Sequence, residues 1–444
     1  MSDPIATLPK DADADADGVG FRYRGDLLCV DGVPLATIAE ACGTPTYVYS
    51  RGAIEAAYRA FASSLAGVEH RICYAVKANS NLAVLQVLAR LGAAFDIVSG
   101  GELTRVLRAG ATADRVVFSG VGKSTAEMEE ALRAGVGCFN LESPQELEAL
   151  EQVAKRVDLR ATVAIRVNPD VDARTHPYIS TGLRENKFGV QPDQALALAE
   201  RIARSPHLRL SGIGCHIGSQ ITELAPLEEA FTSVLRIAER IEASCGKLDH
   251  LDLGGGLGIR YRDETPIPLE QYGRMIRRVL ANRRDLVVKL EPGRRIVGSA
   301  GALLTRVRFT KTQGTRNFAV IDAAMNDLIR PALYEAWHQV LPADKRDTGH
   351  RAEWDLVGPV CESGDFIALD RTLSISGGQL FAVMEAGAYG FVMSSNYNTR
   401  GRAAEVLADG NRFHVVRRRE TIEDLLALES TVAFQDGSAT NKRP

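Results

Sequence analysis

The sequence predicts an α/β fold in which a (β/α)8 barrel of the TIM type is followed by a mostly β C-terminal domain. Three observations lead to this prediction. Eight short apolar runs alternate with segments of helical period between about residues 70 and 290, and such alternation implies βαβ units and a parallel sheet. Eight units in roughly 230 residues fit a closed barrel, with a doubly wound open sheet as the alternative. Beyond about residue 300 the strand-like runs continue without regular helices between them.

Each barrel strand is predicted from a short apolar run. The runs are 71–76, 94–98, 115–119, 138–141, 162–167, 210–215, 250–253 and 286–290. The helices between them are predicted from apolar stripes with helical spacing. They are expected at 80–91, 101–109, 124–134, 143–155, 192–204, 226–244 and 268–282. Ser124 and Ser143 stand at two helix starts, each with a glutamate three residues later, which is the pattern of a capping box.

The domain boundaries follow from where this alternation begins and ends. Strands of the C-terminal domain are expected at 302–309, 318–322, 355–360, 366–369, 380–384 and 412–417. The short strands and turns expected over 21–49 precede the barrel and are interpreted as joining this β domain. The predicted division is a disordered acidic tail (1–18), an N-terminal segment of the β domain (19–48), the barrel (49–300), the β domain (301–425) and a flexible C-terminal tail (426–444).

The composition is that of an ordinary globular chain and excludes several classes of partner. The 444 residues are 45% hydrophobic and 25% charged, with a net charge of −3, so neither nucleic acid nor an anionic membrane is an expected partner. No signal peptide and no stretch of 18 apolar residues is visible. The seven cysteines are scattered and lack CxxC spacing, which indicates a reducing compartment, taken to be the cytoplasm, and no metal site.

Polar side chains follow the ends of most predicted barrel strands, where barrel enzymes carry their chemistry. Each of them alone has a structural explanation: Lys77 could form a salt bridge with Asp96 or Glu102, and His216 could be a hydrogen-bonded core histidine. Their convergence on one rim favours a site. The set is Lys77, Asp96, Glu102, Arg166, Asn168, His216, Ser219, Gln220, Gly254, Gly255, Gly256, Glu291, Pro292, Gly293 and Arg294.

Two of these features together predict the cofactor. Glycines after the seventh strand, beside the Glu-Pro-Gly-Arg stretch at 291–294, are placed where barrels often hold a phosphate, although three glycines alone are more often a turn. A lysine across the rim could form a Schiff base with an aldehyde. Pyridoxal 5′-phosphate has both groups and serves as an electron sink. Glu291 could keep its pyridine nitrogen protonated, and His216 could stack on its ring.

With these motifs, the chain resembles the fold-type III pyridoxal-phosphate decarboxylases, and among them most closely the diaminopimelate decarboxylases. The resemblance runs from about residue 20 to 420 and rests on ten motifs in order. They are YAVKAN (74–79), FDIVSGGEL (95–103), NPDVDARTHPYISTG (168–182), KFG (187–189), HIGSQ (216–220), LGGGLG (253–258), EPGR (291–294), MNDLIRPALY (325–334), CESGD (361–365) and AGAYG (386–390).

The resemblance implies a role for each site residue. Lys77 would be the Schiff-base lysine, Glu291 would pair with the pyridinium and His216 would stack on the ring. Asp96, Glu102 and Arg166 match supporting positions. The phosphate would be held by Gly254 to Gly256, the backbone of Pro292, Gly293 and Arg294, Ser219 and Tyr389. Substrate contacts would come from Arg294, Arg330, Tyr334, Glu362 and Tyr389, with Cys361 as general acid.

The resemblance also implies the substrate and the assembly. The substrate would be meso-diaminopimelate, because arginines suit a distal carboxylate that ornithine lacks, and the product would be L-lysine. Cys361 and Glu362 would complete the site of the other subunit in a homodimer. A decarboxylase for ornithine, arginine or another amino acid, and a non-catalytic cofactor-binding relative, stay as alternatives. Arg330 and Tyr334 could instead form a surface salt bridge, and Cys361 could be an inert core residue.

One departure from the family pattern lies in the stretch NYNTRGR (396–402). Gly401 stands where the family commonly has proline, and a glycine is expected to make this segment more flexible.

Overall fold

Eight parallel strands close into a barrel in the computed structural model, which describes residues 19–172, 186–347 and 349–432. The neighbours run in the order β10-β11-β12-β5-β6-β7-β8-β9. The pairing of β12 with β5 closes the cylinder, so the predicted barrel is confirmed and the open sheet is excluded. The strands are β5 (His70–Ala75), β6 (Ala94–Ile97), β7 (Val116–Phe118), β8 (Cys138–Leu141), β9 (Ala161–Arg166), β10 (Leu208–Gly214), β11 (His250–Asp252) and β12 (Val287–Leu290).

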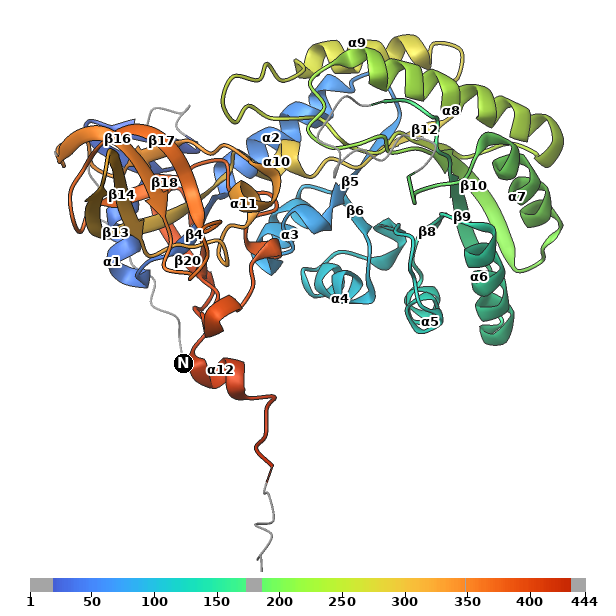
Figure 1. Cartoon of the computed structure of the whole chain (residues 1–444). Helices are drawn as coiled ribbons and strands as arrows, with labels where there is room; N and C mark the ends of the chain where they lie inside the picture. The colour runs from blue at the N-terminus through green and yellow to red at the C-terminus, as the bar shows by residue number, and fades with distance from the viewer. Residues whose placement is uncertain (1–18, 173–185, 348, 433–444) are drawn as a thin grey trace, which may run out of the picture.

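Helices surround these strands on the outside of the barrel (Figure 1). Each predicted helix is present, and the structure adds α2 before the first barrel strand and the short α10 after the last. They are α2 (Arg51–Ser64), α3 (Leu82–Arg90), α4 (Gly100–Arg108), α5 (Thr125–Ala134), α6 (Pro144–Val157), α7 (Pro192–Arg204), α8 (Leu224–Cys245), α9 (Leu269–Val279) and α10 (Arg294–Val297).

The two predicted capping boxes have different outcomes. Ser124 forms a complete box at the start of α5. At α6, Ser143 caps the helix, but the Glu146 carboxylate does not return to the Ser143 amide. It accepts a hydrogen bond from the Glu142 amide at 2.7 Å and pairs with the buried Lys123 ammonium. The second box is therefore absent. Leaving the buried Lys123 ammonium unpaired would cost more free energy than leaving one helix-end amide without a side-chain partner.

The β domain contains strands from both ends of the chain. Its main path runs β17-β16-β14-β13-β4-β19-β20, with β15 and β18 paired beside β13. From the N-terminal segment, β4 (Thr46–Ser50) pairs with β13 and β19. The remaining strands are β13 (Gly301–Gln313), β14 (Arg316–Ile321), β15 (Val340–Pro342), β16 (His350–Val357), β17 (Phe366–Ile375), β18 (Leu380–Val383), β19 (Ala404–Asp409) and β20 (Arg412–Arg417).

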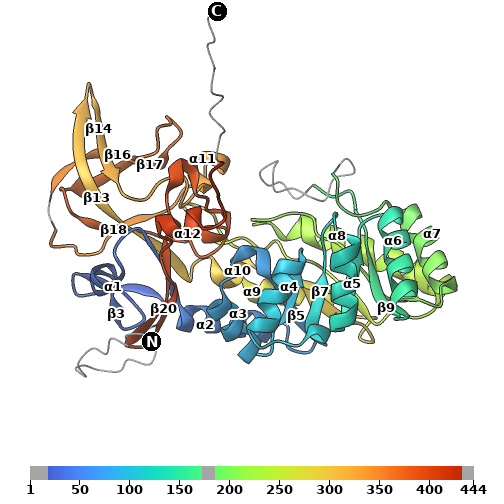
Figure 2. The ribbon, with the colours of Figure 1, turned by 90° about the horizontal axis from the view of Figure 1, so that it is seen from below.

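The rest of the N-terminal segment packs on this domain. It forms a small sheet of β1 (Phe21–Arg24), β2 (Leu27–Val30) and β3 (Val33–Pro34), followed by α1 (Leu35–Cys42). The helix α1 is a difference from the strands and turns expected over 21–49. Its buried face contributes Leu35, Ile38 and Ala39 to the core of the β domain. The barrel and the β domain lie side by side in the views of both Figure 1 and Figure 2. We propose that the barrel domain spans residues 49–300 and the β domain residues 301–425, with residues 19–48 joining the β domain.

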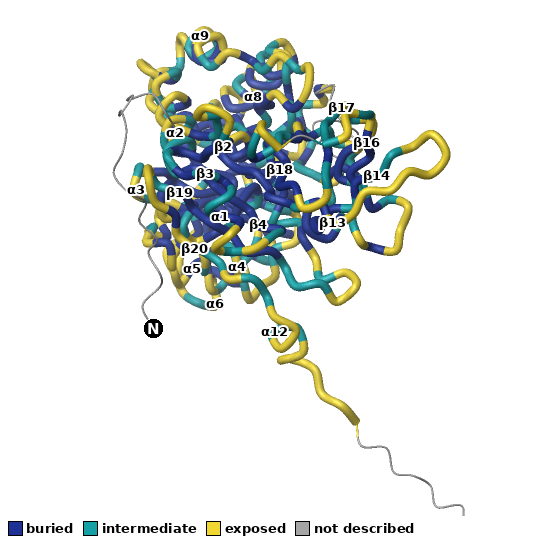
Figure 3. Tube along the Cα trace, turned by 90° about the vertical axis from the view of Figure 1, so that its left-hand side faces the viewer, coloured by how far each residue is buried: buried dark blue, intermediate teal, exposed yellow. Residues whose placement is uncertain are grey.

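The last described residues differ from this packed body. The buried residues gather in the barrel and the β sheet, whereas α12 (Ile422–Leu426) and residues 427–432 extend outward and are mostly exposed (Figure 3). The predicted acidic tail lies outside the described residues, as do residues 433–444. Within the described part of the chain, no helix combines the length and the apolar character that spanning a membrane requires.

Gly401 has a packing role that the sequence did not indicate. A Cβ on Gly401 would lie 2.4 Å from the carbonyl oxygen of Glu420. Around it, the Glu420 carboxylate accepts hydrogen bonds from the Asn396 side chain and the Arg402 amide, at 2.8 and 3.0 Å. Glycine here permits two backbone segments to approach closely, so added flexibility is not needed to explain it.

Candidate active site

Lys77 lies just after β5, in the 3-10 turn Val76–Ala78. Its Nζ is 2.9 Å from Oδ2 of Asp96, whose side chain is fully buried. The salt bridge considered from the sequence therefore exists. Burial alone would lower the pKa of Lys77, but the negative charges of Asp96 and Glu291 outweigh it and raise that pKa. The Lys77 side chain is 36% exposed, and it lines a cavity. The ion pair and a chemical role are therefore compatible.

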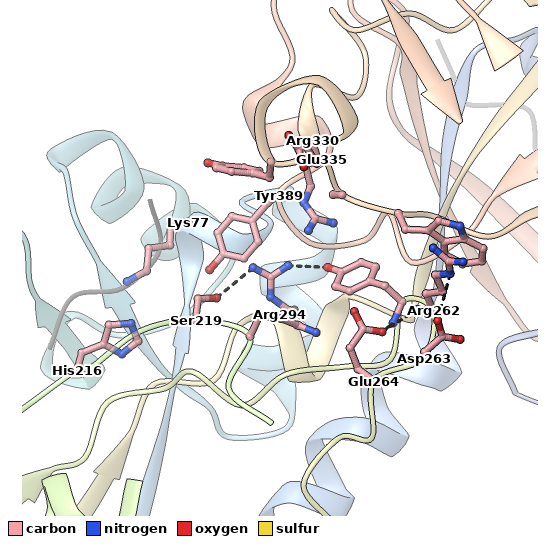
Figure 4. A pocket seen from close by; sticks show the side chains of 15 residues that line it. Lys77, His216, Ser219, Arg262, Asp263, Glu264, Arg294, Arg330, Glu335 and Tyr389 are labelled. Atoms are coloured by element: carbon pink, nitrogen blue, oxygen red, sulfur yellow. Dashed lines mark hydrogen bonds and ion pairs between the residues drawn. The ribbon is translucent and has the colours of Figure 1, made fainter. Parts of the chain in front are cut away.

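The cavity has a volume of about 600 Å³ and lies between the barrel rim and the β domain. The barrel contributes Lys77 and His216, and the β domain contributes Arg330 and Tyr389. Figure 4 shows Lys77 and His216 at one end of the site, Ser219 and Tyr389 next to them, and Arg294 and Arg330 farther from Lys77. Its lining comprises Lys77, His216, Ser219, Gln220, Tyr261, Arg262, Asp263, Glu264, Arg294, Arg330, Tyr334, Glu335, Ala336, Trp337 and Tyr389.

Glu291 follows β12 and lies at the barrel end of the site. It lines a narrower recess together with Lys77, His216 and Tyr389. Burial, together with the nearby carboxylates of Asp252 and Asp96, raises the pKa of Glu291 well above its usual range. A carboxyl group held in this way gains strongly from a cationic partner. A protonated pyridine nitrogen is such a partner.

His216 follows β10 and is held in one neutral tautomer. Its Nδ1 accepts a hydrogen bond from the Gly255 amide at 3.1 Å, so the ring proton is on Nε2. Burial lowers the pKa of His216 well below its usual value, and the charges of Arg166 and Lys77 lower it further. The result is an uncharged flat ring at the cavity wall, which suits stacking on another ring.

Arg166 and Glu102 occupy the surroundings of these residues without lining the main cavity. Arg166 donates to Glu142 at 2.8 Å and to the carbonyl of His216 at 3.4 Å. Glu102 accepts a hydrogen bond from the Val98 amide at 2.7 Å, and burial raises its pKa to about 7. Both residues therefore lie near the predicted cofactor site without lining its cavity, and their supporting role stays a prediction.

The glycines after β11 allow three loops to meet. A Cβ at Gly254, Gly255 or Gly256 would lie 2.5, 2.1 or 2.5 Å from a backbone oxygen of a neighbouring loop. However, two of these amides are already engaged: Gly254 donates to Asp252 Oδ1 and Gly255 donates to His216 Nδ1. Gly254 and Gly255 thus shape the loop, and Gly256 is the one of the three that lines the recess beside Lys77.

The rest of the proposed phosphate site gathers at the same recess. It is lined by Ser219, Pro292, Gly293, Arg294 and Tyr389. A Cβ on Gly293 would lie 2.8 Å from that of Ala78, so this loop also packs tightly against the lysine turn. The Tyr389 amide donates to the Ala78 carbonyl at 2.8 Å, which ties the β domain to the same turn.

Two buried arginines line the cavity, and one of them, Arg294, also borders the recess. Arg294 and Arg330 are 7% and 6% exposed. Arg294 donates to the Tyr261 hydroxyl and to Ser219 Oγ, at 2.5 and 3.0 Å. Among the residues that the structure describes, no ion pair joins a carboxylate to either guanidinium. Since buried charges are normally paired, these two cations indicate an anionic ligand.

Cys361 and Glu362 do not join this cavity within one chain. They lie exposed in the loop between β16 and β17. Cys361 Sγ is 3.7 Å from Asn398 Oδ1, and Glu362 accepts a hydrogen bond from the Tyr397 hydroxyl. Because the Cys361 thiol is exposed, the interpretation of Cys361 as an inert core residue is excluded. Tyr334, in α11 (Arg330–Tyr334), does line the cavity, and Arg330 is buried and not part of a surface salt bridge.

Several residues in or around the cavity were not predicted from the sequence. Asp252 ends β11 and has an amide and the Asn140 side chain as donors, and its place at a strand end was the available signal. Tyr261 and Trp337 lie in loops without a motif, so no pattern pointed to them. His338, directly after Trp337, contacts Arg330.

The described residues fit pyridoxal phosphate on chemical grounds. Asp96 Oδ1 is a buried acceptor without a described partner. The pKa of the Glu291 carboxyl is raised well above its usual value. These two carboxylates can receive a cationic ring, Lys77 can receive an aldehyde, and the tight glycine loops can receive a phosphate. Most of the 168–182 motif lies outside the described residues and does not enter this test.

Comparison with known proteins agrees with the geometry. Residues 51–298 match the family model of the pyridoxal-dependent decarboxylases, pyridoxal binding domain. The chain therefore belongs to the pyridoxal-dependent decarboxylases, the class that this barrel and lysine site define. It belongs, within that class, to the diaminopimelate decarboxylase family.

Three relatives carry this more specific assignment. The chain is 58% identical to a diaminopimelate decarboxylase of Pseudomonas aeruginosa, over 92% of this chain and 98% of the relative. It is 53% identical to the Vibrio cholerae protein of that name, over 93% and 99%. The crystal structure of the Helicobacter pylori enzyme complexed with L-lysine is 40% identical, covers 89% of this chain and 98% of that one, and has a TM-score of 0.86.

Proposed function

We propose that this enzyme decarboxylates meso-2,6-diaminopimelate to L-lysine and carbon dioxide, the last step of lysine biosynthesis by the diaminopimelate route. One observation supports the choice of substrate: Arg294 and Arg330 are buried in the cavity that Lys77 also lines (Figure 4). Neither arginine has a carboxylate partner among the described residues. A substrate that bears a carboxylate at each end supplies both a reacting group and a partner for these arginines.

The residues of the site would contact three parts of the cofactor: its aldehyde carbon, its ring and its phosphate. Lys77 would hold it covalently, Glu291 would face its ring nitrogen, and His216 would lie on the ring. Pyridoxal phosphate, when bound, supplies an aldehyde for the amine and a ring that accepts the electron pair left by carbon dioxide. Its phosphate would lie in the recess lined by Ser219, Gly256, Pro292, Gly293 and Tyr389.

Lys77 and the cavity arginines would then orient the substrate. The Lys77 amine would give way to the substrate amine at the reacting end. Arg294 and Arg330, with Tyr334, would bind the distal carboxylate. Cys361 of the partner subunit would donate the proton that takes the place of the departing carboxylate on the α-carbon.

A homodimer is part of the proposal, because Cys361 and Glu362 lie away from the cavity of their own chain. Their exposed loop, between β16 and β17, would enter the open side of the other subunit's cavity. Glu362 of the partner subunit would receive the distal amine. All seven cysteines are free thiols, which supports a reducing compartment and thus a cytoplasmic location.

Side-by-side turnover tests this function against its alternatives. With purified holoenzyme, kcat/KM for meso-diaminopimelate is expected to exceed that for L-ornithine and L-arginine by roughly a hundredfold or more, since neither satisfies the buried arginines. The measurement is carbon dioxide release and L-lysine formation. Faster turnover of ornithine would contradict the assignment. Cofactor binding without carbon dioxide release from any of the three would indicate a non-catalytic relative.

A further inference from the structure

His338 is a fully buried histidine outside the predicted site, and it touches one of the two cavity arginines. It follows α11 and has no exposed surface. Its Nε2 is 3.1 Å from Nη1 of Arg330, and its Nδ1 is 2.8 Å from the carbonyl oxygen of Met384. Its carbonyl accepts a hydrogen bond from Arg371 at 3.1 Å, so both its ring and its backbone are held.

These contacts define the ring's protonation. A carbonyl oxygen only accepts, so Nδ1 carries the proton and donates it to Met384. A guanidinium only donates, so Nε2 accepts from Arg330 with its lone pair. Burial is the main cause that lowers the pKa of His338 to about 3, and the positive charge of Arg330 is the second cause. The imidazole is therefore neutral throughout the physiological range of pH.

Tyr261 completes this support. The Arg330 guanidinium lies over the Tyr261 ring, 4.6 Å from its centroid. The His338 ring meets the same tyrosine edge to face at 5.4 Å. The tyrosine hydroxyl accepts from Arg294. Both buried cations are thus held by neutral acceptors and an aromatic face, and no carboxylate among the described residues cancels their charge.

We propose that His338 is a positioning residue for substrate specificity: it fixes the orientation of Arg330 while leaving its full positive charge available to the distal carboxylate of the substrate. An aspartate or glutamate in its place would also orient Arg330, but it would compete with the substrate as a counter-ion. The inference rests on the proposed function, because it requires a carboxylate ligand for Arg330.

The test uses two amide variants and two ligands of the holoenzyme. His338→Asn can still donate to Met384 but is too short to reach Arg330, whereas His338→Gln reaches far enough to accept from it. L-lysine keeps the distal carboxylate, and 1,5-diaminopentane has the same chain and amines without it. Dissociation constants are measured by titration calorimetry, and cofactor affinity is measured separately.

We expect His338→Asn to weaken L-lysine binding by ~10- to 100-fold, the range for a hydrogen bond to a charged group. Binding of 1,5-diaminopentane and of the cofactor should stay as in the wild type. His338→Gln should restore most of the L-lysine affinity. In turnover, His338→Asn should raise KM for meso-diaminopimelate more than it lowers kcat. If this variant does not fold, His338→Phe, which keeps the ring and its contact with Tyr261, carries the same expectations.

Four results would overturn the inference. Unchanged L-lysine binding in His338→Asn would remove the role of the hydrogen bond. Equal weakening of both ligands would indicate a general structural role, and so would failure of His338→Gln to restore binding. A wild-type enzyme that binds both ligands equally would refute the carboxylate contact itself, and with it the proposed substrate, before any variant is compared.

Discussion

Lys77→Ala loses at least roughly a thousandfold in kcat, because the covalent attachment of the cofactor and its transfer to the substrate both use this amine. The variant also leaves Asp96 without its cation at 2.9 Å, and an unpaired buried carboxylate destabilises the fold. Turnover and thermal unfolding are therefore measured on the same preparation. Retained turnover in a folded variant would refute the covalent role.

Lys77→Arg is the matched control for the ion pair. Arginine keeps a positive charge beside Asp96, so the variant should retain near wild-type stability, yet it should lose turnover as severely as alanine. Borohydride reduction of the wild-type holoenzyme should fix the cofactor on the peptide containing Lys77. A label on another lysine would place the covalent site elsewhere.

Cys361→Ala lowers kcat by ~10²- to 10⁴-fold, the range for removal of a positioned general acid. Cofactor affinity should be unchanged, since the cofactor would be held by Lys77, Glu291, His216 and the recess that they line, whereas Cys361 is assigned only the proton transfer. Cys245, a partly exposed thiol at the end of α8, provides the control: Cys245→Ala should leave kcat near the wild-type value. Equal turnover in Cys361→Ala and wild type would remove the thiol from the reaction.

Mixing inactive variants tests whether Cys361 acts across the dimer. In a mixed dimer of Lys77→Ala and Cys361→Ala subunits, one site has both changes and the other has neither. Subunit exchange at equal concentrations should therefore restore about a quarter of wild-type activity, as expected for two equivalent sites and random pairing. No restoration after demonstrated exchange would show that Cys361 serves its own subunit.

The barrel half of the site was accessible from the sequence for a physical reason. Parallel strands place their C-terminal ends on one rim, so Lys77, His216 and Glu291 could be brought together by position alone. The residues of the β domain had no such rule. Arg330 and Tyr389 reached the prediction only through family motifs, and only the folded chain shows that they face the same cavity.

Other features depend on contacts that no local pattern encodes. Tyr261 and His338 are far apart in sequence, and they support Arg330 together only after the β domain packs on the barrel. The absent capping box at Ser143 has the same origin, because Glu146 is taken by Lys123. Gly254 and Gly255 were expected to give amides to a phosphate, whereas those amides bind Asp252 and His216.

The ion pair of Lys77 with Asp96 is compatible with the covalent role that we propose for the same residue. Asp96 and Glu291 keep the amine charged, and the raised pKa of Lys77 follows from their charges outweighing burial. A cofactor whose ring nitrogen carries a proton would engage Glu291 instead. The same carboxylates would then stabilise either the free amine site or the loaded one.

The comparison of meso-diaminopimelate with D-lysine tests the central claim most directly. L-lysine, the product, keeps the L centre, so the D centre of the substrate loses carbon dioxide; D-lysine presents that same end and lacks only the distal carboxylate. If Arg294 and Arg330 bind that carboxylate, kcat/KM for meso-diaminopimelate should exceed that for D-lysine by roughly a thousandfold or more, because both buried cations would otherwise stay unpaired. Comparable values for the two substrates would contradict the account.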